Sequence, residues 1–330
     1  MTLTPAPVLS VRDLSVAIGS RRVVDEVSFD LAAGEVLALV GESGCGKSMT
    51  ALALLGLLPG AARLAGGTIG FEGNDLARLA EPAMRAIRGN RASIVFQDPS
   101  GSLDPLMTIG DQLAEGLNAH HALSRDATHA RSLAMLRAVS ISEPERRLAQ
   151  YPFELSGGMC QRVMIAIAIA AEPAMLLADE PTTALDVTIQ AQILDLLKAL
   201  RRERGTAILL ITHDMGVVAD MADRVAVMYA GRIVETGPVE TMFAAPRHPY
   251  TALLLRSVPR LDDRPKSEMT VIDGSVPAQG DWPPGCRFAP RCPLAEPACT
   301  AAQPALLAIG DARAVACLRH DAVETAMGAQ

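Results

Sequence analysis

The stretch Gly41-Glu42-Ser43-Gly44-Cys45-Gly46-Lys47-Ser48 decides the fold of this chain. It has the spacing G-x-x-x-x-G-K-S, with an apolar run, 36–40, directly before it and a helix-favouring run, 49–58, directly after it. A strand, a glycine-rich loop and a helix in this order form a phosphate-binding loop, because the loop turns its N–H groups inward and the helix adds its positive dipole end. We expect Lys47 to reach the β- and γ-phosphates of a nucleotide and the Ser48 hydroxyl to hold Mg²⁺. The alternative is a glycine-rich turn that merely precedes a helix.

Composition limits the possible classes of protein. The chain has 330 residues, 49% of them hydrophobic, which is enough for two domains or for one large domain with an extension. A net charge of −7 argues against a nucleic-acid-binding surface. No charge-free apolar window reaches the roughly 18 residues of a transmembrane helix, and the N-terminus lacks a signal-peptide pattern. We therefore expect a soluble protein, or one that reaches a membrane only through a partner.

Strand and helix patterns alternate as far as residue 245. Continuous apolar strands, as at 36–40, 175–179 and 207–212, predict a mainly parallel sheet that is covered on both faces. Helical spacing dominates residues 100–171, which we interpret as an insertion into the α/β core. After Pro246 the Pro, Arg and Cys content rises and periodicity fades, so we expect little regular structure in 258–330.

Two acids end the apolar run at 175–179. Asp179 can orient Mg²⁺ through water, and Glu180 can polarise the water that attacks the γ-phosphorus. The alternative is a solvated acid pair at a strand end, with no part in chemistry.

Further motifs now make a family resemblance specific. In chain order the sequence carries Gln97 after a strand, Leu155-Ser156-Gly157-Gly158-Met159, Ala184-Leu185-Asp186, and His213 after a strand. With the P-loop and the acid pair, they resemble the Q-loop, signature, D-loop and switch histidine of ATP-binding cassette (ABC) transporter subunits. FQDP at 96–99, LSGGM in place of LSGGQ, DEPTTALDVT at 179–188 and Arg247-His248-Pro249-Tyr250-Thr251 narrow the resemblance to oligopeptide/dipeptide importer ATPases, which serve peptides, nickel and related solutes.

The resemblance implies a P-loop NTPase core with an antiparallel β subdomain, an inserted helical subdomain and a C-terminal extension. The ABC ATPase domain would span 1–245, with its helical subdomain at about 100–171, and the extension 246–330. ATP would contact residues 41–49, ending at Met49. Mg²⁺ would be held by Ser48, Gln97 and Asp179. Glu180 would act as base, with His213 and Gln97 holding the γ-phosphate and the attacking water.

The resemblance also implies partners. Residues 155–159 and Asp186 would face the ATP of a second, homologous ATPase subunit, and the pair would be heteromeric. Two transmembrane permease subunits and an extracytoplasmic solute-binding protein would complete an importer, with this chain on the cytoplasmic face of the membrane. Nickel or another small solute is the alternative cargo, and a soluble non-transport ABC ATPase is the alternative class.

Two positions depart from the family pattern. Ile18 stands where such subunits place an aromatic residue against adenine, so we predict weak discrimination between ATP and GTP. Cys45 lies inside the P-loop, where it is either a redox-sensitive thiol or a small residue that merely fits.

Four further cysteines are grouped near the C-terminus. Cys286, Cys292, Cys299 and Cys317 have the spacing C-x5-C-x6-C-x17-C. Four thiolates can hold a [4Fe–4S] cluster or Zn²⁺, or the thiols stay free or form disulfides. The arrangement resembles the cysteine tail of some dipeptide-importer ATPases, which implies a [4Fe–4S] cluster. Arg287 and Arg291 could offset its negative charge.

Overall fold

The computed structural model describes residues 6–182, 185–258 and 271–327. Its contacts separate into two compact units. The P-loop unit comprises residues 10–30, 37–70, 212–258 and 271–327, and the helical unit comprises residues 6–9, 31–36, 71–182 and 185–211.

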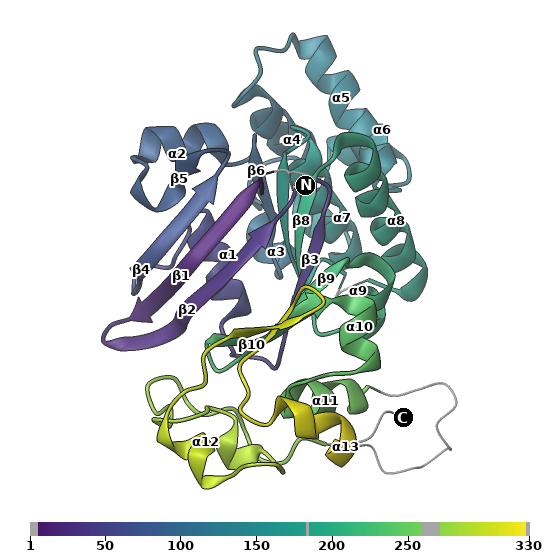
Figure 1. Ribbon diagram of the computed structural model, residues 1–330. Helices are drawn as coiled ribbons and strands as arrows, with labels where there is room; N and C mark the ends of the chain where they lie inside the picture. Colours follow the sequence, from purple (N-terminus) through teal and green to yellow (C-terminus); the bar gives the residue numbers. More distant parts are fainter. Residues whose placement is uncertain (1–5, 183–184, 259–270, 328–330) are drawn as a thin grey trace. The chain divides into compact units, whose positions relative to one another are not determined.

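The P-loop unit contains two groups of paired strands (Figure 1). In the first, the strand order is β2 (Arg21–Leu31), β1 (Leu9–Ile18) and β4 (Ala62–Phe71). The turn at Gly19-Ser20 joins β1 to β2, so these two strands run antiparallel. In the second, β3 (Val36–Val40) pairs in parallel with β9 (Arg224–Tyr229), and β10 (Arg232–Pro238) pairs antiparallel with β9.

Helices of the P-loop unit follow these strands. They are α1 (Lys47–Leu54), α9 (Met215–Met221), α10 (Val239–Ala244), α11 (Pro249–Arg256), α12 (Pro297–Ala301) and α13 (Val323–Met327), with 3₁₀ turns η3 (Ala289–Arg291) and η4 (His320–Ala322). Helix α1 is shorter than the predicted 49–58 segment. It ends because Gly56 takes a left-handed φ of 61° just after it, so the helix-favouring run continues past the end of the helix itself.

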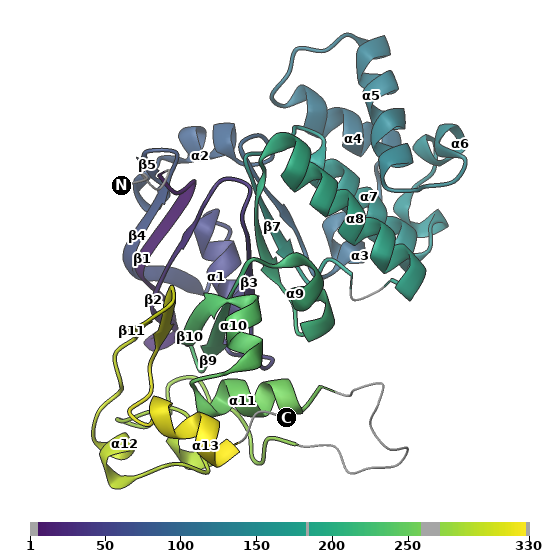
Figure 2. The ribbon, with the colours of Figure 1, turned by 45° about the vertical axis from the view of Figure 1, so that its right-hand side comes forward.

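The helical unit contains three parallel neighbours, β6 (Ala92–Val95), β7 (Met175–Asp179) and β8 (Ala207–Ile211). Every residue of β7 and β8 is buried, as continuous apolar strands predict. The remaining elements are β5 (Asn74–Asp75), η1 (Leu76–Arg78), α2 (Glu81–Ile87), α3 (Pro99–Ser102), α4 (Ile109–Asn118), α5 (Arg125–Ala138), α6 (Pro144–Leu148), η2 (Pro152–Glu154), α7 (Gly157–Ile169) and α8 (Val187–Arg204). Five helices, α3 to α7, fall within residues 99–171, and Figure 2 shows α4 to α7 grouped together.

The C-terminal segment is more ordered than the sequence predicts. Strands β11 (Leu307–Gly310) and β12 (Arg313–Val315) form a hairpin, and β12 pairs antiparallel with β10. The turn between them places Asp311 and Ala312 at left-handed φ angles of 49° and 55°. Alanine is unusual there, so the turn carries no recognisable sequence signal. In both ribbon views the yellow hairpin lies beside β10 (Figures 1 and 2).

Aromatic side chains anchor this segment to the P-loop unit. Phe288 is buried and packs edge-on against Tyr229, with ring centroids 5.2 Å apart. Tyr250 of α11 is also buried and lies 4.6 Å from Tyr229, measured between ring centroids. The segment therefore shares one hydrophobic core with the strands that flank the P-loop.

Candidate functional site

The P-loop follows β3, and two of its glycines have no room for a side chain. A Cβ on Gly41 would lie 2.1 Å from the backbone oxygen of Met228. A Cβ on Gly46 would lie 2.8 Å from the backbone oxygen of Val23, and Gly46 has a φ of 109°. These positions require glycine both for conformation and for space.

Lys47 is folded back over the loop that precedes it. Its Nζ donates hydrogen bonds to the backbone oxygens of Gly41, at 2.8 Å, and Glu42, at 3.0 Å. Ser48 and Met49 lie in the first turn of α1, while Ser43 and Gly44 are exposed at the tip of the loop. The loop therefore presents its ammonium group and the N-terminal N–H groups of α1 together, as an anion site requires.

Cys45 points into the protein. Its side chain is buried, and its sulfur lies 3.7 Å from Lys47 Nζ. Burial raises the pKa of the thiol, although the Lys47 charge opposes this. A buried thiol with a raised pKa is a poor nucleophile, which favours a packing role over a redox-sensitive one.

Glu180 and Gln97 meet in the helical unit. Gln97 Nε2 donates a 3.0 Å hydrogen bond to Glu180 Oε2. The backbone of Glu180 has a left-handed φ of 49°, and its N–H donates to the oxygen of Ile211 at 2.8 Å. Asp179, just before it, is buried at the end of β7. Strained backbone that neighbouring strands hold in place is typical of functional positions.

Gln161 is a residue that the sequence reasoning missed. It lies on α7, is fully buried, and donates from Nε2 to the backbone oxygens of Glu180 and Pro181. It thereby ties the helix of the signature segment to the loop that carries Glu180. The available signal was an amide side chain near the start of a helix that is apolar from Val163 onward.

The signature segment lies at the start of α7. Ser156 is the N-cap residue, and its hydroxyl accepts a hydrogen bond from the Met159 N–H at 3.3 Å. Leu155 precedes the cap, and Gly157 and Gly158 form the first helical turn, where Ser156 and Gly157 are exposed. The expected cap and an accessible helix N-terminus therefore coexist.

Asp186 and His213 are the last two of the expected nucleotide-site residues along the chain. Asp186 caps α8 by accepting from the Ile189 N–H at 3.0 Å, whereas Ala184 lies outside the described residues. His213 is exposed and lies two residues after the end of β8, just before Asp214, which caps α9. The expected nucleotide-site residues are thus divided between the units. The P-loop and His213 belong to the P-loop unit, whereas Gln97, the signature segment, the acid pair and Asp186 belong to the helical unit.

The four C-terminal cysteines line one cavity of about 20 Å³, together with His248 and Phe288. None of them forms a disulfide. Burial raises the pKa of Cys292 to about 11 and of Cys317 to about 12, and neighbouring cysteines add to both shifts. Among the described residues, no three His, Cys, Asp or Glu side chains are arranged to hold a metal ion.

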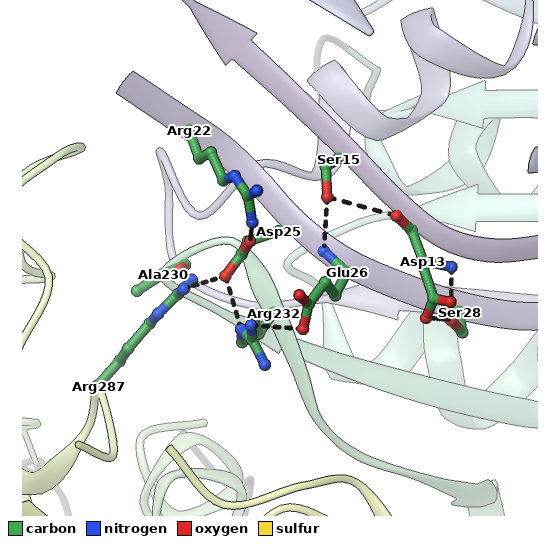
Figure 3. A network of polar contacts seen from close by, with 9 residues as sticks. All are labelled: Asp13, Ser15, Arg22, Asp25, Glu26, Ser28, Ala230, Arg232 and Arg287. Carbon is green, nitrogen blue, oxygen red and sulfur yellow. Dashed lines mark hydrogen bonds and ion pairs between the residues drawn. The ribbon is translucent and has the colours of Figure 1, made fainter. Parts of the chain in front are cut away.

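Arg287 follows Cys286 directly in the sequence, and its side chain points toward Asp25 (Figure 3). Its guanidinium contacts the Asp25 carboxylate on β2 and donates to the Ala230 oxygen at 2.5 Å. The Asp25 carboxylate also forms ion pairs with Arg22, whose Nη1 lies 2.5 Å from Oδ1, and with Arg232, whose Nε lies 2.8 Å from Oδ2. Burial alone would raise the Asp25 pKa, but hydrogen bonds from Arg22 and Arg232 and the Arg287 charge together hold it below its ordinary value.

Arg291 also has a carboxylate partner. Its Nη1 and Nη2 lie 2.9 and 3.1 Å from the two carboxylate oxygens of Glu42 in the P-loop. The expectation that Arg287 and Arg291 offset charge at the cysteines was wrong, because carboxylates at a distance in sequence take both guanidinium groups.

Comparison with known proteins gives two family matches, in separate parts of the chain. Residues 24–183 match the ABC transporter family, and residues 234–299 match the oligopeptide/dipeptide transporter C-terminal region. The dipeptide transport ATP-binding protein DppD of Bacillus subtilis is 50% identical over 319 residues, which cover 95% of each chain. A putative peptide import ATP-binding protein of Brucella abortus is 48% identical over 96% of each chain.

Solved structures agree with this relationship. A dimeric post-hydrolysis state of an ATP-binding cassette bound to ADP and phosphate has a TM-score of 0.64 and 27% identity, covering 70% of this chain and 98% of that one. The ATP-binding subunit of another ABC transporter has a TM-score of 0.62 and 29% identity, covering 71% of this chain and 91% of that one.

Among the described residues, no helix is long and apolar enough to cross a bilayer.

The motifs, the fold and the relatives agree with one another. The chain belongs to the ATP-binding proteins of the ABC transporter family, in the group with the oligopeptide/dipeptide transporter C-terminal region.

Proposed function

We propose that this chain hydrolyses ATP to drive peptide import, as one ATP-binding subunit of an ABC importer. The observation that carries the proposal is the joint presence of the two family matches, in a chain 50% identical to a protein named for dipeptide transport. We assign residues 1–245 to the ATPase domain, with about 100–171 as its helical subdomain, and 246–330 to the extension.

The proposed chemistry assigns a role to each of the motif residues. Glu180 accepts a proton from the attacking water, and its hydrogen bond to Gln97 supports that position. Lys47 and the loop N–H groups bind the β- and γ-phosphates, and His213 contacts the γ-phosphate. Ser48, Asp179 and Gln97 hold Mg²⁺, which neutralises charge on the phosphates when bound.

A second ATPase subunit completes each site in this proposal. The exposed N-terminus of α7 supports it, because Ser156 and Gly157 can approach a nucleotide on another chain. Asp186 would lie at the same interface. The ATPase partner is homologous and the pair heteromeric, with two permease subunits, an extracytoplasmic solute-binding protein and a position on the cytoplasmic membrane face.

We further propose that Cys286, Cys292, Cys299 and Cys317 hold a [4Fe–4S] cluster. The type of donor supports this proposal, because all four thiols line one cavity, although no three of the described side chains are arranged to hold a metal ion as they stand. The Arg319 N–H donates to the Cys317 sulfur at 3.3 Å. At about 20 Å³ the cavity is small, so binding would require the thiols to rearrange around the cluster. Iron and acid-labile sulfide should co-purify anaerobically, whereas stoichiometric zinc without iron would contradict the proposal.

The test of the catalytic assignment is Glu180→Gln in the assembled transporter. Turnover should fall roughly 10²–10⁴-fold with ATP affinity unchanged, because only the base is lost. Glu172→Gln is a matched control, since Glu172 also has a left-handed φ, of 54°, but pairs with Arg131 and Arg204. Full turnover in the Glu180 variant would overturn the assignment.

The transported solute needs a separate experiment. Cells that lack this chain should lose uptake of a labelled dipeptide and regain it with the wild-type gene but not with the Glu180→Gln variant. Restored nickel uptake without dipeptide uptake would favour the alternative cargo. A chain that never co-purifies with membrane subunits would favour the non-transport class.

A further inference from the structure

The P-loop residue Glu42 is held from two sides by residues far away in the sequence. Its backbone N–H donates a 2.8 Å hydrogen bond to the hydroxyl of Tyr250, in α11. Its carboxylate takes both terminal nitrogens of Arg291, at 2.9 and 3.1 Å. Both partners lie in the C-terminal segment, beyond residue 245, and all three residues belong to the P-loop unit.

Arg291 is itself fixed in place. Its side chain is 5% exposed, its Nε donates to the Asp273 oxygen at 2.8 Å, and its Nη2 donates to the Ile272 oxygen at 3.1 Å. The guanidinium carbon lies 5.8 Å from the centre of the Tyr229 ring. Its Nη1 also donates to the Tyr229 hydroxyl at 3.2 Å. A planar guanidinium whose other donors are satisfied by two backbone oxygens and this hydroxyl can present only one geometry to Glu42.

The contact continues from Glu42 to the phosphate-binding lysine. Lys47 Nζ donates to the backbone oxygen of Glu42 at 3.0 Å, so the position of Glu42 helps to set the position of the ammonium group. Arg291 thereby reaches the nucleotide site through one intervening residue. Side chains that orient a binding residue commonly affect affinity, although they touch no ligand.

We propose that Arg291 is a positioning residue for ATP binding: it fixes the P-loop through Glu42, and the C-terminal segment is thus a working part of the nucleotide site. This inference rests on ATP binding at the P-loop and does not depend on which solute is transported or on what the cysteines hold.

The experiment compares three variants of the full chain. Arg291→Leu removes the fork but keeps a side chain that can pack, and should raise the Kd of a fluorescent ADP analogue roughly tenfold. Arg291→Lys keeps the charge but not the bidentate contact, and should recover only part of the affinity. Arg313→Leu is the control, because Arg313 lies in the same segment but forms its buried ion pair with Glu235 of β10 and contacts Thr241 and Ala245, none of them in the P-loop.

Thermal unfolding of each variant separates positioning from simple stabilisation. We expect Arg313→Leu to lower the unfolding temperature while leaving the Kd unchanged, and Arg291→Leu to raise the Kd of the folded fraction. Equal changes in Kd for both variants, or none for Arg291→Leu, would overturn the proposal.

Glu42→Gln covers the case in which Arg291→Leu fails to fold. It weakens the same contact from the P-loop side and should raise the Kd in the same direction. An unchanged Kd in that variant would also overturn the proposal. If the wild-type chain itself bound no nucleotide, that result would instead refute the nucleotide site.

Discussion

The two units hold their site residues by different means. In the helical unit the signature segment and Asp186 are held locally, because Ser156 caps its helix through Met159 and Asp186 caps its helix through Ile189, each three residues away. Glu180 is the exception in that unit, since it pairs with Gln97, 83 residues away. In the P-loop unit Glu42 is held by Tyr250 and Arg291, which are 208 and 249 residues away. The signature segment therefore depends on its own sequence, whereas the P-loop depends on a distant segment.

The largest expected effect is at the P-loop. In Gly46→Ala the new Cβ would meet the Val23 oxygen at 2.8 Å, at a φ of 109°. We expect a loss of about 2–5 kcal/mol in the free energy of unfolding, together with loss of nucleotide binding. Urea denaturation and nucleotide titration measure these effects, and wild-type values for both would refute the description of this loop.

The next effect is a pH dependence in the P-loop unit. His248 caps α11 by accepting from the Tyr250 N–H, and burial lowers its pKa from 6.5 to about 3. Below pH 6.5 the unfolded chain therefore binds a proton that the folded chain does not bind. As the pH is lowered from 6.5 toward the folded pKa, the free energy of unfolding decreases by about 1.4 kcal/mol per pH unit.

His248→Asn tests this dependence, because asparagine keeps an acceptor for the cap but does not titrate. Urea denaturation at pH 7 and at pH 5 should show a smaller loss in the variant than in the wild-type chain. Identical losses would show that His248 is not the group responsible.

Gln161 offers a way to break the contrast between the units. It is a longer-range tether within the helical unit, donating to the Pro181 oxygen 20 residues away. Gln161→Leu should cost about 1–3 kcal/mol in the free energy of unfolding, because two backbone oxygens lose a buried donor. Turnover of the assembled transporter should also fall, and a fully active, equally stable variant would mean that α7 does not orient the Glu180 loop.

The smallest expected effect on stability is at the signature. A Cβ on Gly157 would meet nothing within 4 Å, so Gly157→Ala should leave stability unchanged or raise it by up to about 1 kcal/mol. Turnover of the assembled transporter should nevertheless fall, because the side chain would crowd a partner's nucleotide. Denaturation and ATPase assays measure the two effects, and unchanged turnover would contradict the interface role.

These contrasts explain which features could be predicted from the sequence. The strands 36–40 and 175–179 match the structure because continuous apolar runs dictate buried strands. The caps at Ser156 and Asp186 follow from local chemistry. The pairing of Arg291 with Glu42 could not be predicted, since no local rule brings together residues 249 apart. From the sequence, the positive charges of Arg287 and Arg291 were expected to act on the neighbouring cysteines, but both guanidinium groups pair with distant carboxylates.

The central claim is that this chain binds ATP by itself but hydrolyses it only when a partner's signature completes the site. The direct measurement is the ATPase rate per chain for a strictly monomeric fraction, verified by sedimentation, alongside its nucleotide affinity. We predict nucleotide binding with little turnover, and a marked rise in turnover when the partner ATPase and permease subunits are added. Robust turnover by the monomer, independent of protein concentration, would contradict the claim.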